Sequence, residues 1–250
     1  MDPKLKLQRA GAILFALALW QFAAMALNQN LLLVSPIKVI ARLFTVWMED
    51  GFFSTIWFSF RRIVGGFFLG FLLGLILGVL AGHFPLVETL LWPFVVTIKS
   101  VPVASFVIIS LIWLSSSELS VFISFLMVFP VIYSNVLGGI QSTDRKLLEM
   151  AELYRLPFRK RLLYIHMPQL KPFLLSGCSV ALGLSWKSGI AAEVIGIPNG
   201  SIGEMLYESK IYFNTADLFA WTVIIVLISL GFEKFFMKFL KILFQRLERQ

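Results

Sequence analysis

Residues 142–172 (STDRKLLEMAELYRLPFRKRLLYIHMPQLKP) form a polar segment between two long apolar blocks of the chain. Apolar residues recur in it at helical spacing on both sides of Pro157. Because proline lacks an N–H and clashes with the preceding turn, we expect Pro157 to separate two short amphipathic helices and Pro168 to end the second. The segment, called the polar loop below, holds seven of the 22 basic residues of the chain: Arg145, Lys146, Arg155, Arg159, Lys160, Arg161 and Lys171.

The composition outside the polar loop is that of an integral membrane protein. Of the 250 residues, 58% are hydrophobic, and the mean hydropathy is +0.85, above the range of soluble domains. The net charge of +8 comes from residues at the ends of apolar blocks, so we expect contact with lipid headgroups and not with nucleic acid. Cys178 is the single cysteine, so the chain forms no internal disulfide, and no P-loop motif for ATP occurs.

The apolar blocks predict an all-α membrane protein with six transmembrane helices. The first block starts with a basic segment and ends near Ala24-Met25-Ala26, which is also typical of a cleavable signal peptide; we interpret it as a retained span. Pro36 opens an amphipathic interfacial helix, and residues 197–217 are expected to be a polar loop with a Pro198-Asn199-Gly200 turn. The predicted spans cover residues 10–27, 58–82, 86–114, 119–140, 173–195 and 218–232.

The distribution of basic residues predicts the orientation of these spans. With the N-terminus in the cytoplasm, fifteen basic residues lie in cytoplasmic segments and five in external ones. Lys99 and Lys187 fall within the membrane. Since cytoplasmic loops carry the excess of Lys and Arg, both termini and the polar loop are predicted to be cytoplasmic.

Glycines recur every fourth residue in the second predicted span and form one stripe along it. In lipid, small residues let two helices approach closely, so this stripe predicts a helix–helix contact and not a ligand site. The stripe consists of Gly66, Gly70, Gly74, Gly78 and Gly82.

Ionisable and helix-breaking residues inside apolar blocks are candidates for a translocation path. Lys99-Ser100-Val101-Pro102 interrupts the third block, and Lys187 and Glu193 lie in the fifth. Broken helices and intramembrane charges mark substrate paths in many transporters. The alternatives are a snorkelling Lys99 on a kinked helix, and an interhelical hydrogen bond or salt link for Lys187 and Glu193.

The polar loop resembles the EAA loop of the permeases of ABC importers. Glu149, Ala151, Ile165 and Pro168 match the family pattern in register, and Met150 and Met167 replace Ala and Leu. Arg155 stands where the family usually has Gly, which puts the tight turn between the two coupling helices in doubt; Pro157 is the other candidate for that break. The resemblance implies that an ATPase docks on a surface formed by Glu149, Ala151, Arg155, Pro157, Ile165 and Pro168.

The wider sequence, including residues near Trp186 and Glu193, resembles the nitrate, sulfonate and taurine branch of these permeases. This implies a type I importer fold in the bacterial inner membrane, with a homodimer of permeases, two ATP-binding subunits and an extracytoplasmic solute-binding protein. ATP and Mg²⁺ would bind the ATPase, with no cofactor or metal on this chain, and the solute would be a small anion or a vitamin precursor. We divide the chain into an N-terminal span with its interfacial helix (1–53), a permease core (54–236) and a basic tail (237–250).

Two other functions compete with this interpretation. A stand-alone secondary transporter or channel would use Lys99, Lys187 and Glu193, but it would leave the polar loop unexplained. An intramembrane serine protease is suggested by Gly177-Cys178-Ser179-Val180-Ala181, although the two histidines of the chain are poorly placed to serve as its base. No H-E-x-x-H motif for metal-dependent hydrolysis occurs.

Overall fold

The computed structural model describes residues 3–27 and 33–247, and every regular element in them is helical. Residue Arg249 of the predicted basic tail lies outside these residues, as do the side chains of Lys4, Lys6, Arg9 and Arg159. Along the chain the helices are α1 (Pro3–Leu27), α2 (Pro36–Val46), α3 (Phe52–His83), α4 (Pro85–Ser100), α5 (Val103–Ser110), α6 (Ser116–Gln141), α7 (Arg145–Leu153), α8 (Phe158–Arg161), the π-helical turn η1 (Leu162–His166), α9 (Met167–Gly196), α10 (Ile202–Ile211) and α11 (Thr215–Leu247).

Four of the described helices are long and apolar enough to cross a membrane: α3, α6, the helix from Tyr164 to Gly196, and α11. The pair α4 and α5 makes a fifth candidate span, bent by 103° at its break. The apolar part of α1, Gly11–Leu27, is shorter. The described chain therefore holds four or five candidate spans. The sixth span that the sequence predicts corresponds to α1, whose apolar part is shorter.

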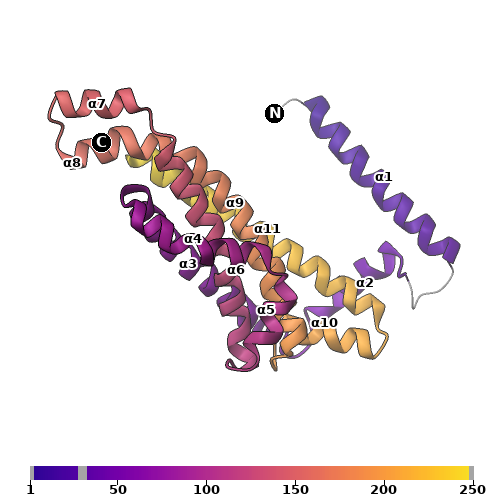
Figure 1. Ribbon diagram of the computed structural model, residues 1–250. Coiled ribbons are helices and arrows are strands. Elements are labelled where there is room, and N and C mark those ends of the chain that lie inside the picture. The colour runs from indigo at the N-terminus through magenta and orange to yellow at the C-terminus, as the bar shows by residue number, and fades with distance from the viewer. Residues whose placement is uncertain (1–2, 28–32, 248–250) are drawn as a thin grey trace.

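The core lies where α3, α6 and α9 pack together, with α11 alongside (Figure 1). Phe67 from α3, Leu182 from α9 and Phe236 from α11 are buried in one cluster, and the Phe67 and Phe236 rings meet edge to face at 5.0 Å. In Figure 1, most of α1 stands apart from these helices, although the ring of its Trp20 lies 5.3 Å from that of Phe219 on α11. Its side chains are mostly exposed, as expected of a helix that faces lipid.

The glycine stripe of α3 lies directly against α6. A Cβ atom added at Gly66 would lie 2.3 Å from the carbonyl oxygen of Val121, and one at Gly74 would lie 2.9 Å from Cβ of Ile132. Gly70, Gly78 and Gly82 meet α6 side chains equally closely, at 2.8 Å. The backbones of the two helices thus approach to a distance that only glycine allows along this face.

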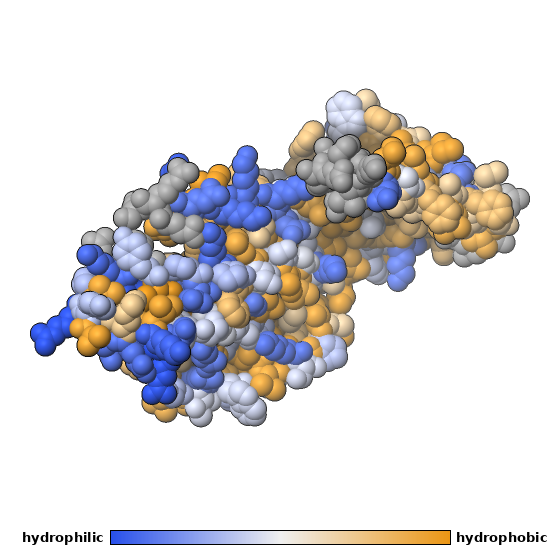
Figure 2. Space-filling model, turned by 90° about the horizontal axis from the view of Figure 1, so that it is seen from above, coloured by the Kyte–Doolittle hydropathy of each residue, from blue (hydrophilic) through white to orange (hydrophobic). Residues whose placement is uncertain are grey.

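The polar loop and α10 lie at opposite ends of the helices (Figure 1). Seen from above, hydrophilic side chains gather at the end that holds α7 and α8 (Figure 2). At the α10 end, Arg42 of α2 pairs with Glu49 and with Asp217 of α11. This ion pair fastens the interfacial helix to the start of the last span.

Three expectations about element boundaries were wrong. Residues 197–217 are not a plain loop, because Ser201 caps the helix α10 by accepting a hydrogen bond from the backbone N–H of Glu204 at 3.0 Å. The last helix continues past Phe232 to Leu247, since Leu240 and Phe244 are buried in the core. Pro168 does not end a helix but lies at the start of α9, directly after the π-helical turn η1.

Candidate functional site

The first half of the polar loop is a well-terminated amphipathic helix, α7. Asp144 caps its start, with Oδ1 accepting a hydrogen bond from the backbone N–H of Lys146 at 2.9 Å. At its end, the N–H of Leu156 donates to the carbonyl of Ala151 at 2.9 Å and that of Arg155 to Glu152 at 3.0 Å. This hydrogen-bond pair is the Schellman motif, which requires a left-handed conformation at the first of the two donor residues after the helix.

Arg155 is that left-handed residue, with a φ of +49°. A left-handed conformation costs a non-glycine residue about 1–2 kcal/mol. The structure therefore forms the tight turn with Arg155 itself, without a glycine. Pro157 follows the turn, and its carbonyl accepts from the N–H of Arg161 at 3.1 Å in the next helix, α8. The first helix thus ends at Leu153, four residues before Pro157.

The two faces of α7 differ in exposure. Ala151 is 2% exposed and packs inward. Glu149 is exposed and pairs across one turn with Arg145 at 3.5 Å. Large apolar side chains next to it are also exposed: Met150 at 46%, Leu153 at 80% and Tyr154 at 71%. An exposed apolar edge with charges beside it, outside the span region, is a surface suited to contact with another protein.

The second half of the polar loop leads into the next span without a break. α8, η1 and α9 follow one another directly, so Pro168 sits within continuous helical structure. The wider π-helical turn before Pro168 leaves room for its ring, which in a regular helix would clash with a carbonyl four residues earlier. Ile165 is 5% exposed and Pro168 is exposed. Of the six predicted coupling residues, Ala151 and Ile165 therefore face inward, and the exposed ones are Glu149, Arg155, Pro157 and Pro168.

The third predicted span is broken where the sequence indicates. Val101 and Pro102 lie between α4 and α5, and Oγ of Ser100, the last residue of α4, donates to the carbonyl of Val96 at 2.8 Å. Nζ of Lys99 donates a 2.6 Å hydrogen bond to Oγ of Ser134 on α6. The two residues border a cavity of about 230 Å³, which is also lined by Glu88, Trp92, Val95, Val96, Tyr133 and Leu137.

Glu193 and Lys187, which the sequence places on loosely the same side of one span, have different surroundings. Lys187 is exposed, whereas Glu193 is fully buried. Oε2 of Glu193 accepts a 2.6 Å hydrogen bond from Oγ of Ser59 on α3 and one of 3.4 Å from the N–H of Gly203 in α10. Ser59 Oγ in turn accepts from the N–H of Ile202 at 2.9 Å. Ser59 and Glu193 thus bind two free N–H groups at the start of α10, and the contact is an interhelical hydrogen bond.

Close packing seals this group, called the α10 junction (Ser59, Glu193, Ile202 and Gly203) below. A Cβ atom added at Gly203 would lie 2.3 Å from Cβ of Glu193. Sequence reasoning did not single out Gly203, nor Ser134, the partner of Lys99. The sequence does indicate that Ser59 faces another helix, because it lies seven residues before Gly66 and so shares the close-packing face of α3.

Comparison with protein families matches residues 70–249 to the binding-protein-dependent transport system inner membrane components. The chain belongs to this family. It is accordingly the permease component of an ABC transporter, a membrane subunit without catalytic activity of its own. Such a component works with a solute-binding protein and an ATPase.

Known relatives of this permease are similar over most of their length. The taurine transport system permease protein TauC of Escherichia coli (strain K12) is 26% identical, over 86% of this chain and 80% of its own. The nitrate import permease protein NrtB of Synechococcus elongatus is 25% identical, over 83% and 78%. The E. coli protein named "Putative aliphatic sulfonates transport permease protein SsuC" is 30% identical, over 79% and 76%.

Proposed function

We propose that this permease is the translocating subunit of an ATP-driven importer, and that α7 transmits ATP-driven closure of a separate ATPase to the spans. The observation that carries the proposal is the exposed apolar edge of α7, formed by Met150, Leu153 and Tyr154 beside Glu149. The Schellman turn at Arg155 fixes this helix relative to α8, and α8 continues into α9. A force applied to α7 would therefore pass through this turn into the continuous helical segment formed by α8, η1 and α9.

The proposed assembly follows the family. Two copies of this permease would form the pathway, with two ATP-binding subunits at the cytoplasmic face, a solute-binding protein outside, and ATP and Mg²⁺ on the ATPase alone. The bias of fifteen to five basic residues supports a cytoplasmic polar loop and cytoplasmic termini in the bacterial inner membrane. With α1 as the first span, the chain has six. Residues 54–236 would then be the permease core, between an N-terminal segment (1–53) and a basic tail (237–250).

We propose that the solute is a small anion, moved by alternating access past the broken span α4–α5. Lys99 supports this proposal, because its ammonium lies at a cavity beside the break and its hydrogen-bond partner in the described part of the chain is the neutral hydroxyl of Ser134. Relatives named for nitrate and for taurine, which carries a sulfonate, are in line with an anionic solute. Ser100 and Pro102 would shape the path, and Lys187 would add positive charge from α9. The burial of Glu193 favours a structural role for that carboxylate.

The coupling role is tested by co-purification from detergent-solubilised membranes. We expect an ATPase to co-purify with the wild-type permease and to be lost with Glu149→Arg, because the charge reversal falls beside the exposed edge of α7. Glu208→Arg on α10 makes the same change of charge at the opposite end of the molecule and should retain the ATPase. A permease that purifies alone and still moves solute in vesicles without ATP would be a stand-alone secondary transporter, and the proposal would be wrong.

The anionic path is tested by solute uptake into proteoliposomes that contain the whole transporter. We expect Lys99→Ala to abolish uptake while the assembled complex is retained, since the path loses its positive charge at the break. Lys210→Ala, in exposed α10, removes an equal charge away from the path and should leave uptake close to the wild-type rate. Normal uptake by the Lys99→Ala and Lys187→Ala variants together would exclude this path.

A further inference from the structure

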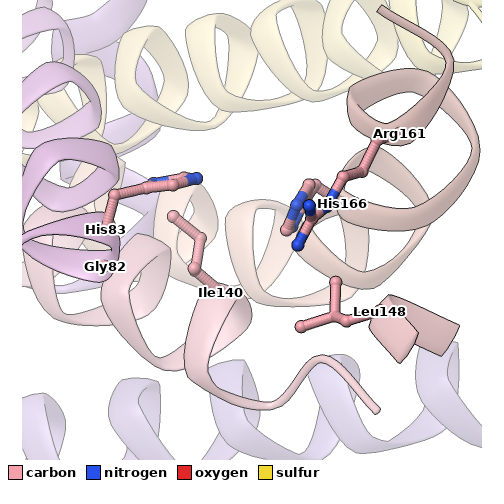
Figure 3. A pocket seen from close by; sticks show the side chains of 6 residues that line it. All are labelled: Gly82, His83, Ile140, Leu148, Arg161 and His166. Atoms are coloured by element: carbon pink, nitrogen blue, oxygen red, sulfur yellow. The ribbon is translucent and has the colours of Figure 1, made fainter. Parts of the chain in front are cut away.

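A second cavity lies between the polar loop and the ends of the spans. It has a volume of about 340 Å³ and is lined by Gly82, His83, Ile140, Leu148, Arg161 and His166. His83 and Gly82 end α3, Ile140 lies in the last turn of α6, Leu148 belongs to α7, Arg161 ends α8 and His166 ends η1. His83 and His166 extend into the cavity from opposite sides, and Arg161 lies beside His166 (Figure 3).

Both imidazole rings line this cavity. Nδ1 of His83 lies 2.9 Å from the carbonyl oxygen of Val79 and donates to it, which leaves Nε2 of His83 for another partner. Nδ1 of His166 is buried and has no hydrogen-bond partner among the residues that the structure describes. The two ring centroids are 5.8 Å apart. A buried polar atom without a partner is costly, so its place at a cavity calls for a ligand.

The charges of the lining residues select the class of ligand. Among the residues that the structure describes, the lining holds the guanidinium of Arg161 and the N–H donors of two imidazoles, and no Asp or Glu. Arg161 repels a metal cation that two histidines would otherwise suit. A guanidinium donates charge-assisted hydrogen bonds to the oxygen atoms of an oxyanion, and imidazole N–H groups add further donors.

We propose that this cavity binds a small oxyanion of the phosphate type, either free in solution or as the phosphate of a lipid headgroup. The anion would join the end of α3, through His83, to the polar loop, through Arg161 and His166. Because the proposed function makes the polar loop the element that moves with the ATPase, occupancy of this site would oppose that movement. The regulatory part of this inference rests on the proposed function; the binding of phosphate does not.

The binding test uses the full-length permease purified in detergent, with inorganic phosphate as the probe. Unfolding is followed by tryptophan fluorescence during heating, with chloride at equal ionic strength as the reference. We expect phosphate to raise the unfolding temperature saturably. Replacement of a charged hydrogen-bond donor by Arg161→Gln should weaken the apparent affinity by about tenfold or more. Lys160→Gln removes the neighbouring exposed charge of α8 and should bind phosphate as the wild type does.

Two further variants test the side chains of the site, and a measurement in lipid vesicles distinguishes free phosphate from a lipid headgroup. His166→Gln should weaken binding, and Arg161→Lys, which keeps the charge, should restore part of it. In phosphatidylcholine vesicles that also contain phosphatidic acid, loss of the effect of free phosphate would identify a headgroup as the occupant; an unchanged effect would identify the free anion. No saturable effect in any arm, or equal affinity in Arg161→Gln and wild type, would overturn the site. A negative result here, with ATPase still retained by the wild type, leaves the proposed function intact.

Discussion

Polar side chains are buried at one end of this permease and exposed at the other. At the α10 junction, Glu193 is fully buried and its carboxylate binds Ser59 and the N–H of Gly203 from two other helices. On α7 of the polar loop, Glu149 is exposed, and Leu153 beside it is 80% exposed. The junction holds Oε2 of Glu193 by hydrogen bonds within the chain, whereas α7 presents both charge and apolar surface outward. The first arrangement fixes structure, and the second is suited to a partner.

The largest effect is expected in the close contact of α3 and α6, next to the α10 junction. In Gly66→Ala, the new Cβ would lie 2.3 Å from the carbonyl oxygen of Val121, which is backbone and cannot swing away. We expect a loss of about 3 kcal/mol in the free energy of unfolding, the upper part of the range for overpacking. Gly65→Ala, on the adjacent face with no atom within 4 Å, should be neutral or slightly stabilising, because alanine favours helix. Thermal unfolding in detergent measures both, and equal stability of the two variants would contradict the close contact.

A smaller loss is expected when the α10 junction loses its hydroxyl. Ser59→Ala removes the donor to Glu193 and the acceptor for the N–H of Ile202, which leaves two buried polar groups without that partner. The expected destabilisation is about 2 kcal/mol. Ser54→Ala, an exposed serine of the same helix, should change stability by less than about 0.5 kcal/mol. If both variants unfold alike, the junction does not hold α10 in place.

On α7, a substitution should reduce binding without reducing stability. Leu153→Ala removes an exposed side chain, so we expect the free energy of unfolding to change by less than about 0.5 kcal/mol. Affinity for the ATPase should fall about tenfold, the loss typical of an apolar anchor at an interface. Binding of the purified ATPase to reconstituted permease measures the second quantity. A variant that binds the ATPase normally would show that this edge of α7 is not the contact surface.

The smallest effect concerns the turn at Arg155. Arg155→Gly relieves the left-handed conformation at φ +49° and should stabilise the loop by about 1 kcal/mol. Arg155→Ala removes the same side chain but keeps the conformational cost, so it should give no such gain. Hydrogen exchange at the amide of Leu156, which closes the turn, reports the difference. Faster exchange in the glycine variant than in wild type would contradict this account of the turn.

The sequence predicted part of the site through patterns that are local in the chain. A helix before Arg155 and a break at Lys99-Ser100-Val101-Pro102 follow from apolar spacing and from proline chemistry, and the structure has both. The effect of Pro168 was missed because it depends on what precedes it, a π-helical turn that no composition signal announces. The helix α10 was missed because residues 197–217 are polar, and the hydrogen bonds that hold its first N–H groups come from Ser59 and Glu193, which are distant in sequence or on another helix.

By itself, the sequence determined that this chain is an all-α membrane protein of the binding-protein-dependent permease family, because long apolar blocks, charge bias and the register of Glu149 to Pro168 are properties of the chain alone. Only the tertiary structure decided which of the two ionisable side chains of α9 is buried and which is exposed. Lys187 and Glu193 are six residues apart on one helix, and both are ionisable residues in an apolar block, so nothing in the sequence distinguishes a buried side chain from an exposed one. Packing of α3 and α10 against one face of α9 buries Glu193 and leaves Lys187 exposed, since burial depends on neighbours that only the fold brings together.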